Sequence, residues 1–516
     1  MGMNERRAGI ILHPVSLPST DGIGDFGEVA FKFVDFLHES GMGIWQILPL
    51  GPTGYGDSPY TSVSSFAGNP LFISLDVLSD EGLIDKSRLE SRPVFPLDKV
   101  DYPEVYSWKL PLIRQAASRF LQRRISSEVS EYEIFCKKET AWLEDYAFFM
   151  TAKTFFDKQA ADEGVQNSIW NRYWPEELSL REPGEMRRRR EQWREEIEIE
   201  KVTQYFFSKQ WTMLKSYANR HGISIFGDIP IFVSPNSADV WAHPELFKLD
   251  KNNRPYLVAG VPPDYFSQTG QRWGNPLYEW DEHLRTGFSW WITRIEKALE
   301  ITDILRIDHF RGFEACWEIA AENLTAIRGT WVKSPGREFF HELNKQLGDL
   351  PVVAEDLGVI TPEVEQLRRE FGFFGMKVLQ FAFESDGKGG LNPDNPFLPH
   401  NHEADYIVYT GTHDNDTSLG WFRGLGREFQ GLVESYFGKT NESVVWDMIR
   451  AAFMSPARIA VIPMQDVLNL DSDARMNTPG TVGSNWNWRV RREAFNQEIS
   501  GKLRWFSRLY GRLPRE

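Results

Sequence analysis

The chain has 516 residues, of which 41% are hydrophobic, and 58 basic and 73 acidic residues give it a formal net charge of -15. This negative charge disfavours nucleic acid, since neutralising backbone phosphates requires basic side chains, and it is compatible with a neutral substrate, which gains nothing from electrostatic steering. The two cysteines form no paired motif and no apolar run is long enough to span a bilayer, so we expect a cytoplasmic protein without a disulfide framework.

Short apolar segments that end abruptly in glycine or polar residues occur eight times along the chain. They lie at 8–12, 44–48, 223–226, 303–307, 351–354, 376–381, 406–409 and 459–462. Segments of helical spacing separate most of them, for example 26–40, 288–300 and 362–371, the last with Thr361 as a candidate N-cap. Because alternating strands and helices form a parallel sheet, and eight such units close into a barrel, we predict an α/β fold, a (β/α)8 TIM barrel.

The spacing of these strands is uneven. The long gap between the second and third strands is charged and helical in pattern, and acidic residues follow its basic run at 187–190, as is typical of a solvated helix. We therefore expect one catalytic barrel over residues 1–516, with a large helical insertion subdomain at approximately 76–220. A second insertion at approximately 234–276, rich in Gly, Pro and aromatic residues, is too long for a passive connector.

Three of the predicted strands end in acidic residues, namely Asp308, Glu355 and Asp414. In a barrel of this kind the carboxyl ends of the strands form the mouth of the active site. Cleavage of a glycosidic bond needs two carboxylates, one ionised to attack or stabilise the reacting carbon and one protonated to release the leaving oxygen. The residue types at the strand ends therefore point to glycoside chemistry.

Asp308 follows Arg306 by two positions, so both side chains point to the same side of the strand. A guanidinium beside a carboxylate favours the ionised form that a nucleophile requires. A plain ion pair at the rim of the barrel is the alternative, and the residue pattern alone leaves both open. The adjacent His309 is placed to contact a sugar hydroxyl or a metal, but no second histidine stands at ligand spacing.

Glu355 and Asp356 are neighbours, so only one of them can face the barrel axis. The residue order does not choose between them, because an acid/base needs a less polar pocket than its partner carboxylate and the order of residues does not show the pocket. Either residue is an alternative N-cap for the following helix, a role that suits Asp356 better.

The segment around Asp414 is dense in hydroxyl, imidazole and carboxylate groups that are suited to bonding sugar hydroxyls. Local turn chemistry is the alternative, and it is stronger for Asn415 and Asp416 than for His413 and Asp414, which lie nearest the strand. No Gly-x-Ser-x-Gly motif, phosphate-binding loop or dinucleotide fingerprint is present, and the glycine-rich segment 22–27 is predicted to be a turn.

Several longer motifs resemble those of the 4-α-glucanotransferases (amylomaltases) of glycoside hydrolase family 77. The matching segments run from 12–14 to 485–489 and include 51–60, 66–70, 227–231, 260–276 and the three acidic motifs. Many of these motifs are long and nearly unique to the family, and the variable stretch is the helical insertion. Two small departures, at Ser65 and Cys316, remove no catalytic group.

The resemblance implies roles for individual residues. Asp308 would be the nucleophile, Glu355 the acid/base and Asp414 the transition-state stabiliser, so the resemblance ranks Glu355 over its neighbour. The accompanying substrate contacts that it implies are Arg306, His413, Tyr60, Ser58, Asp264, Tyr265, Phe266, Gln271, Trp273 and Asn485, and Tyr55 lies in a stretch associated with a second glucan site. The insertion at approximately 234–276 would then border the substrate groove.

The resemblance also implies a reaction. The enzyme would move α-1,4-linked glucan segments from a donor to the 4-hydroxyl of an acceptor glucan or glucose by a retaining double displacement. An α-amylase-like hydrolase and a glucan-binding scaffold without activity are the alternatives. The expected partners are α-1,4-glucans and malto-oligosaccharides, with no nucleic acid, no membrane, no cofactor and no metal, and we expect a monomer or a weak homo-oligomer.

Overall fold

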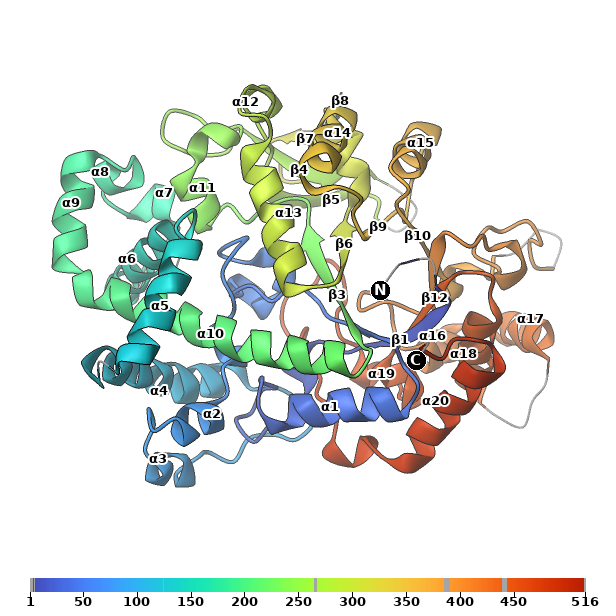
Figure 1. Ribbon diagram of the computed structural model, residues 1–516. Helices are drawn as coiled ribbons and strands as arrows, with labels where there is room; N and C mark the ends of the chain where they lie inside the picture. The colour runs from blue at the N-terminus through green and yellow to red at the C-terminus, as the bar shows by residue number, and fades with distance from the viewer. Residues whose placement is uncertain are drawn as a thin grey trace.

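The computed structural model describes residues 3, 5–123, 125–166, 168–263, 267–384, 390–438 and 443–514, and only the backbone of Tyr55. Eight strands form one parallel sheet in the order β10-β11-β12-β1-β2-β3-β6-β9. Phe374, next to β10, forms a parallel bridge with Val353 of β9, which joins the two edges into a barrel (Figure 1). The predicted TIM barrel is therefore confirmed.

Each predicted strand has a counterpart in this sheet, with small shifts at the ends. The bounds are β1 Arg7–Ile11, β2 Ile44–Gln46, β3 Ser224–Pro230, β6 Ile304–Asp308, β9 Val352–Ala354, β10 Gly375–Val378, β11 Tyr406–Tyr409 and β12 Ile459–Pro463. The largest difference is at β3, which continues four residues beyond its predicted end, and the last three residues predicted for β10 form a 3₁₀ turn instead, η7 (Leu379–Phe381). The strands are almost completely buried, as parallel strands covered by helices are.

Helices cover the outside of the barrel (Figure 1). The three segments predicted to be helical correspond to α1 (Glu28–Glu39), α13 (Ser289–Ile301) and α15 (Pro362–Glu370). Thr361 is the N-cap residue of α15, but its side chain makes no capping hydrogen bond. The other helices after β3 are α11 Ala238–Ala242, α12 Trp280–Arg285, α14 Gly336–Leu347, α16 Ser418–Gly424, α17 Arg427–Phe437, α18 Val444–Met454, α19 Met464–Val467 and α20 Gln497–Leu509.

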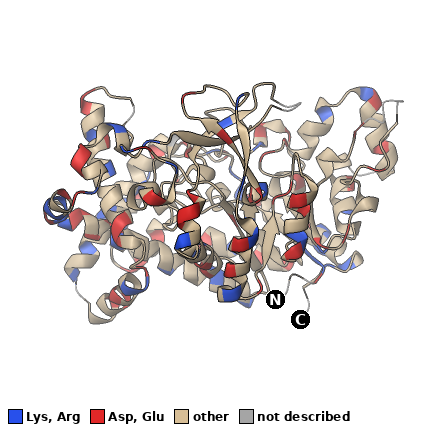
Figure 2. Ribbon diagram, turned by 90° about the horizontal axis from the view of Figure 1, so that it is seen from above, with Lys and Arg blue, Asp and Glu red and all other residues tan. Residues whose placement is uncertain are grey.

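The chain between β2 and β3 is helical. It contains α2 Leu75–Asp80, α3 Lys86–Glu90, α4 Tyr102–Arg123, α5 Ser126–Lys138, α6 Leu143–Asp162, α7 Trp170–Tyr173, α8 Glu176–Ser179, α9 Pro183–Gln192 and α10 Arg194–Arg220. The basic run lies in α9, where Arg189 pairs with Glu185 in the i,i+4 arrangement expected of a solvated helix. Figure 2 shows acidic and basic residues interspersed over the helices. The subdomain bounds of approximately 76–220 stay a prediction.

A second sheet follows the carboxyl ends of β3 and β6, and the sequence analysis did not predict it. It is antiparallel, in the order β5-β4-β7-β8, with bounds β4 Leu257–Val261, β5 Gln271–Pro276, β7 Ala315–Ala320 and β8 Thr330–Lys333. The segment expected to be a groove loop thus supplies two strands to this sheet. Among the residues placed in the structure, no helix combines the length and the apolar character needed to cross a bilayer.

Candidate active site

Asp308 and Glu355 lie side by side at the carboxyl ends of two neighbouring strands. Asp308 is the last residue of β6, and Glu355 directly follows β9. The two strands are paired in parallel with Ile307 opposite Ala354, so the next residue of each strand is an acid. Because neighbouring strands lie about 4.7–4.9 Å apart, this register places the two carboxyl groups at the same point of the barrel mouth.

Arg306 connects Asp308 to another carboxylate. Its Nη2 donates to Asp308 Oδ1 at 2.7 Å, and its Nη1 donates to Asp228 Oδ2 at 2.5 Å. Burial alone would lower the pKa of Arg306, but the charges of the two carboxylates outweigh it and raise that pKa well above its ordinary value. Arg306 therefore stays charged, and Asp308 has the guanidinium partner that the sequence analysis expected.

Asp228 is a residue of the site that the sequence analysis missed. It is buried at the end of β3, and Tyr60 donates its hydroxyl to Oδ2 at 2.8 Å. Burial, with the charge of Asp308, raises the pKa of Asp228 to about 7 against the opposing effect of Arg306. The signal was present, because the third predicted strand ends in Gly227-Asp228 just as other strands end in acids.

Glu355, and not Asp356, faces the site. Its Oε2 accepts a hydrogen bond from the backbone N–H of His309 at 2.9 Å, and its Oε1 accepts one from the N–H of Leu357 at 3.0 Å. Burial, and then the charge of Asp308, raise the pKa of Glu355 to about 8. At neutral pH the side chain is therefore mostly protonated, which is the state that a general acid requires.

Asp356 points into the wall of the barrel. Its Oδ1 accepts from the N–H of Met376 at 2.7 Å, and its Oδ2 lies 3.3 Å from Nε of the buried Arg368. The helix-cap role considered for Asp356 is wrong, because α15 begins only at Pro362 and has Thr361 as its N-cap.

Asp414 lies on the loop after β11 and not on a strand. Its Oδ1 accepts from Nδ2 of Asn477 at 2.6 Å, and its carbonyl oxygen accepts from Nη2 of Arg475 at 2.8 Å. Asn477 was not among the predicted residues, because no local pattern marks a partner 63 residues away. The ring of the adjacent His413 is stacked on Tyr60 with centroids 5.2 Å apart, and burial lowers the pKa of His413.

Asn415 and Asp416 bond to nearby backbone groups, as expected if they serve local turn structure. Asn415 Oδ1 accepts from the N–H of Thr412 at 2.9 Å and from its hydroxyl at 2.8 Å. Asp416 accepts from the N–H of Thr417 at 2.8 Å and from the hydroxyl of Ser472 at 2.8 Å.

His309 and Trp273 form an aromatic edge beside Asp308. Their rings meet edge to face with centroids 4.7 Å apart, and Trp273, on β5, is 38% exposed. Gln271 Oε1 accepts from Trp273 Nε1 at 3.2 Å. His309 has a φ of 52°, in the left-handed region that non-glycine residues rarely adopt and that is often found at functional sites. Burial lowers the pKa of His309 to about 4, so its ring is neutral.

The other described residues that were predicted to contact substrate bond mainly within their own loops. Ser58 caps the turn that carries Tyr60, since its hydroxyl accepts from the N–H of Tyr60 at 3.3 Å. Asn485 bonds within its own loop, accepting from the N–H of Thr478 at 3.1 Å and donating to Thr481 at 3.2 Å. Asp264, Tyr265, Phe266 and the side chain of Tyr55 lie outside the described residues. Within the described part of the chain, no group of three His, Cys, Asp or Glu side chains is arranged to hold a metal ion.

Comparisons with known proteins agree on one family. The family model described as 4-alpha-glucanotransferase matches residues 12–495. The chain is 50% identical to the 4-alpha-glucanotransferase of Thermus thermophilus over 97% of both chains, and 47% identical to that of Synechocystis sp. over 99% of both. The amylomaltase of Streptococcus agalactiae, solved in complex with acarbose, superposes with a TM-score of 0.93 at 40% identity and covers 98% of this chain and 100% of its own.

Proposed function

The chain belongs to the 4-α-glucanotransferase family, glycoside hydrolase family 77, and on that premise we propose that Asp308, Glu355 and Asp414 carry out its reaction. The enzyme is a transferase that moves glucan segments, and the hydrolase alternative is not favoured. The observation that carries the residue assignment is the register of β6 with β9. It sets a carboxylate bonded to arginine beside a buried carboxyl group whose pKa is raised.

In the first step Glu355 donates its proton to the glycosidic oxygen of an α-1,4-glucan while Asp308 attacks the anomeric carbon. The bond between that carbon and the leaving oxygen breaks, and a covalent glucosyl–Asp308 ester forms. The buried environment of Glu355 supports its part, because the proton is held at neutral pH. The guanidinium of Arg306, 2.7 Å from Asp308, supports the ionised nucleophile.

In the second step Glu355, now a carboxylate, removes the proton from the 4-hydroxyl of an acceptor glucan or glucose. The acceptor oxygen attacks the anomeric carbon and releases Asp308, so two inversions give net retention. Retention requires carboxyl groups about 5–5.5 Å apart, and the 4.7–4.9 Å spacing of adjacent strands supports that separation.

Asp414 is proposed to stabilise the transition state by accepting hydrogen bonds from hydroxyls of the reacting sugar. Its second oxygen lies 3.4 Å from His413 Nε2, so the two side chains would bind the same ring. Trp273, Gln271 and His309 are proposed to line the acceptor side and to exclude water from the ester, which favours transfer over hydrolysis.

The proposed substrates are α-1,4-glucans and malto-oligosaccharides. The relative from Streptococcus agalactiae was solved with acarbose, which supports an oligosaccharide in the corresponding groove of this chain. We also propose a single catalytic unit over 1–516 that acts as a monomer or weak homo-oligomer. The free cysteines Cys136 and Cys316 support a cytoplasmic location, since a reducing compartment keeps thiols reduced.

Incubation with maltotriose tests the proposal. Transfer yields glucose together with longer oligomers and no net gain of reducing ends, whereas hydrolysis yields a steady gain of reducing ends. Bound maltotriose without any turnover would identify a scaffold instead of an enzyme. Products formed mainly by hydrolysis would contradict the proposed exclusion of water by Trp273, Gln271 and His309.

A further inference from the structure

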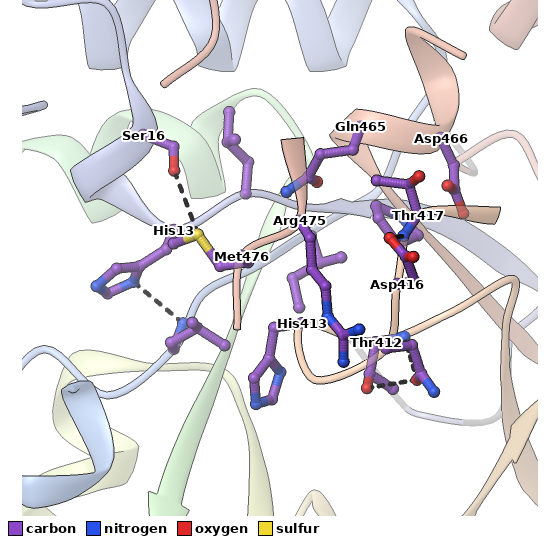
Figure 3. Close-up of a pocket in the computed structure, with 15 residues that line it drawn as sticks. His13, Ser16, Thr412, His413, Asp416, Thr417, Gln465, Asp466, Arg475 and Met476 are labelled. Carbon is purple, nitrogen blue, oxygen red and sulfur yellow. Dashed lines mark hydrogen bonds between the residues drawn. The ribbon is translucent and has the colours of Figure 1, made fainter. Parts of the chain in front are cut away.

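The loop that carries His413 and Asp414 borders a small cavity. The cavity has a volume of about 30 Å³ and is lined by residues of this loop, by the ends of β1 and β2, and by residues of 463–476 (Figure 3). A space of this size holds about two water molecules. In Figure 3 the side chain of Arg475 extends toward Thr412 from the opposite wall. The underside of the loop therefore borders a space that side chains do not fill, and the position of the loop depends on hydrogen bonds.

One buried carboxylate bonds to both ends of this loop. Asp466, in α19, accepts from the hydroxyl of Thr410 at 2.5 Å, from the hydroxyl of Ser418 at 2.7 Å and from the N–H of Ser418 at 2.8 Å. Thr410 directly follows β11, and Ser418 is the first residue of α16. Asp466 is 1% exposed. A single side chain thus sets the distance between the two points where the loop leaves regular structure.

The burial of the Asp466 carboxylate costs folding free energy. The bonds to Asp466 come from neutral donors, and a buried carboxylate without a cation is destabilising unless its oxygens are well hydrogen-bonded. Burial raises the pKa of Asp466, and the bonds from Thr410 and Ser418 oppose that change. Both oxygens act as acceptors, whereas an amide has one acceptor oxygen, so at least one of the three bonds must reverse or break in an asparagine variant.

We propose that Asp466 is a positioning residue for glucan transfer, which fixes both ends of the 410–418 loop so that Asp414 meets the reacting sugar. Arg475 and Asn477 hold the middle of the loop at Asp414, and Asp466 holds its ends. The inference rests on the proposed role of Asp414, and it assigns to Asp466 no contact with substrate.

The test compares Asp466→Asn with a matched variant elsewhere. Asp25 is also buried and accepts one backbone N–H, from Gly27 at 2.9 Å, and one hydroxyl, from Ser19 at 2.7 Å. It lies in the turn before α1 and also faces Lys109 at 3.6 Å. Asp25→Asn therefore controls for the stability lost when a buried carboxylate becomes an amide. For both variants, kcat and KM for maltotriose transfer are measured below the unfolding transition, together with Tm.

We expect both variants to lose Tm, and only Asp466→Asn to lose kcat, by about 10- to 100-fold, because small displacements of catalytic groups cost factors of this size. KM should stay within about twofold, since the lost interaction is made in the transition state. Thr410→Ser keeps the hydroxyl and should retain kcat, whereas Thr410→Val removes it and should lower kcat. If Asp466→Asn does not fold, the comparison of Thr410→Ser with Thr410→Val still tests the positioning role.

Full kcat in Asp466→Asn, whatever its Tm, would overturn the proposal, as would an equal loss of kcat in the two Asp→Asn variants or equal kcat in Thr410→Ser and Thr410→Val. Asp414→Asn belongs in the same series. If that variant keeps full kcat, the proposed role of Asp414 fails, whereas an active Asp466→Asn beside an inactive Asp414→Asn refutes only the positioning role.

Discussion

The two halves of the active site are built in different ways. Asp308 and Glu355 stand at the ends of paired strands, where the sheet continues past them through the bond from the Glu355 N–H to the Ile307 carbonyl at 3.0 Å. Asp414 stands on a loop above a cavity and is held by side chains from 475–477, with Asp466 at the ends of the loop. Local backbone structure thus positions the reacting pair, and long-range side-chain bonds position the stabilising group.

The largest effect is expected at the strand half of the site. Asp308→Asn removes the nucleophile but keeps an oxygen that accepts from Arg306, so the fold should be retained while transfer falls by roughly 10⁴-fold or more. The disproportionation rate of maltotriose measures this loss. Asp162→Asn, at the exposed end of α6, is the surface control and should be fully active. Substantial transfer by Asp308→Asn would refute the nucleophile assignment.

Glu355 and Asp356, the two residues that follow β9, should differ in their effect on kcat. Glu355→Gln removes the acid/base, so we expect kcat to fall by about 10²- to 10⁴-fold. Its amide should also lower Tm, because both oxygens of Glu355 accept backbone N–H groups and an amide nitrogen cannot. Asp356→Asn weakens the contact with buried Arg368, so we expect a loss of about 1–3 kcal/mol in unfolding free energy with kcat preserved. Kinetics and thermal unfolding of the two variants make the comparison, and the reverse pattern would show that Asp356 serves the reaction.

The strand half of the site could largely be predicted from the sequence, because each strand is a local apolar run that ends in a polar residue. The choice between Glu355 and Asp356 could not be made from residue order, since it depends on which side of β9 faces the axis. Asp228 met the same local criterion and was overlooked. The second sheet escaped prediction because β5, Gln271–Pro276, lacks apolar alternation and pairs with a distant partner.

Asp414 itself could be predicted from its place after a strand, but the residues that hold its loop could not, because they are distant along the chain. Asp466 is 56 residues from Thr410 and 48 from Ser418, and Asn477 is 63 residues from Asp414. The local sequence around each of these side chains does not mark it as part of the site. Only the closed barrel, which pairs β12 with both β11 and β1, brings them to Asp414.

A smaller effect is expected at the middle of the loop. Asn477→Ala removes the 2.6 Å bond to Asp414, so we expect kcat for maltotriose to fall by about 10- to 100-fold while KM changes little. Asn219→Ala is the matched control and should keep kcat, because the amide of Asn219 donates to Asp303 at 2.8 Å at the end of α10. Equal kcat in the two variants would contradict the role of Asn477, and a loss in Asn485→Ala seen mainly in KM would favour the predicted contact of Asn485 with the glucan.

The smallest effect is a dependence on pH that should belong to the strand half alone. The raised pKa of Glu355 means that the free enzyme holds the required proton below about pH 8 and loses it above, so kcat/KM should fall about tenfold per pH unit on the alkaline side. Asp228, whose pKa is raised to about 7, titrates nearby. Asp228→Asn should therefore keep the alkaline decline, while the residual activity of Glu355→Gln should lack it. If the alkaline decline in kcat/KM persists in Glu355→Gln, a group other than Glu355 supplies the catalytic proton. The register of β6 with β9 would then not account for the acid/base.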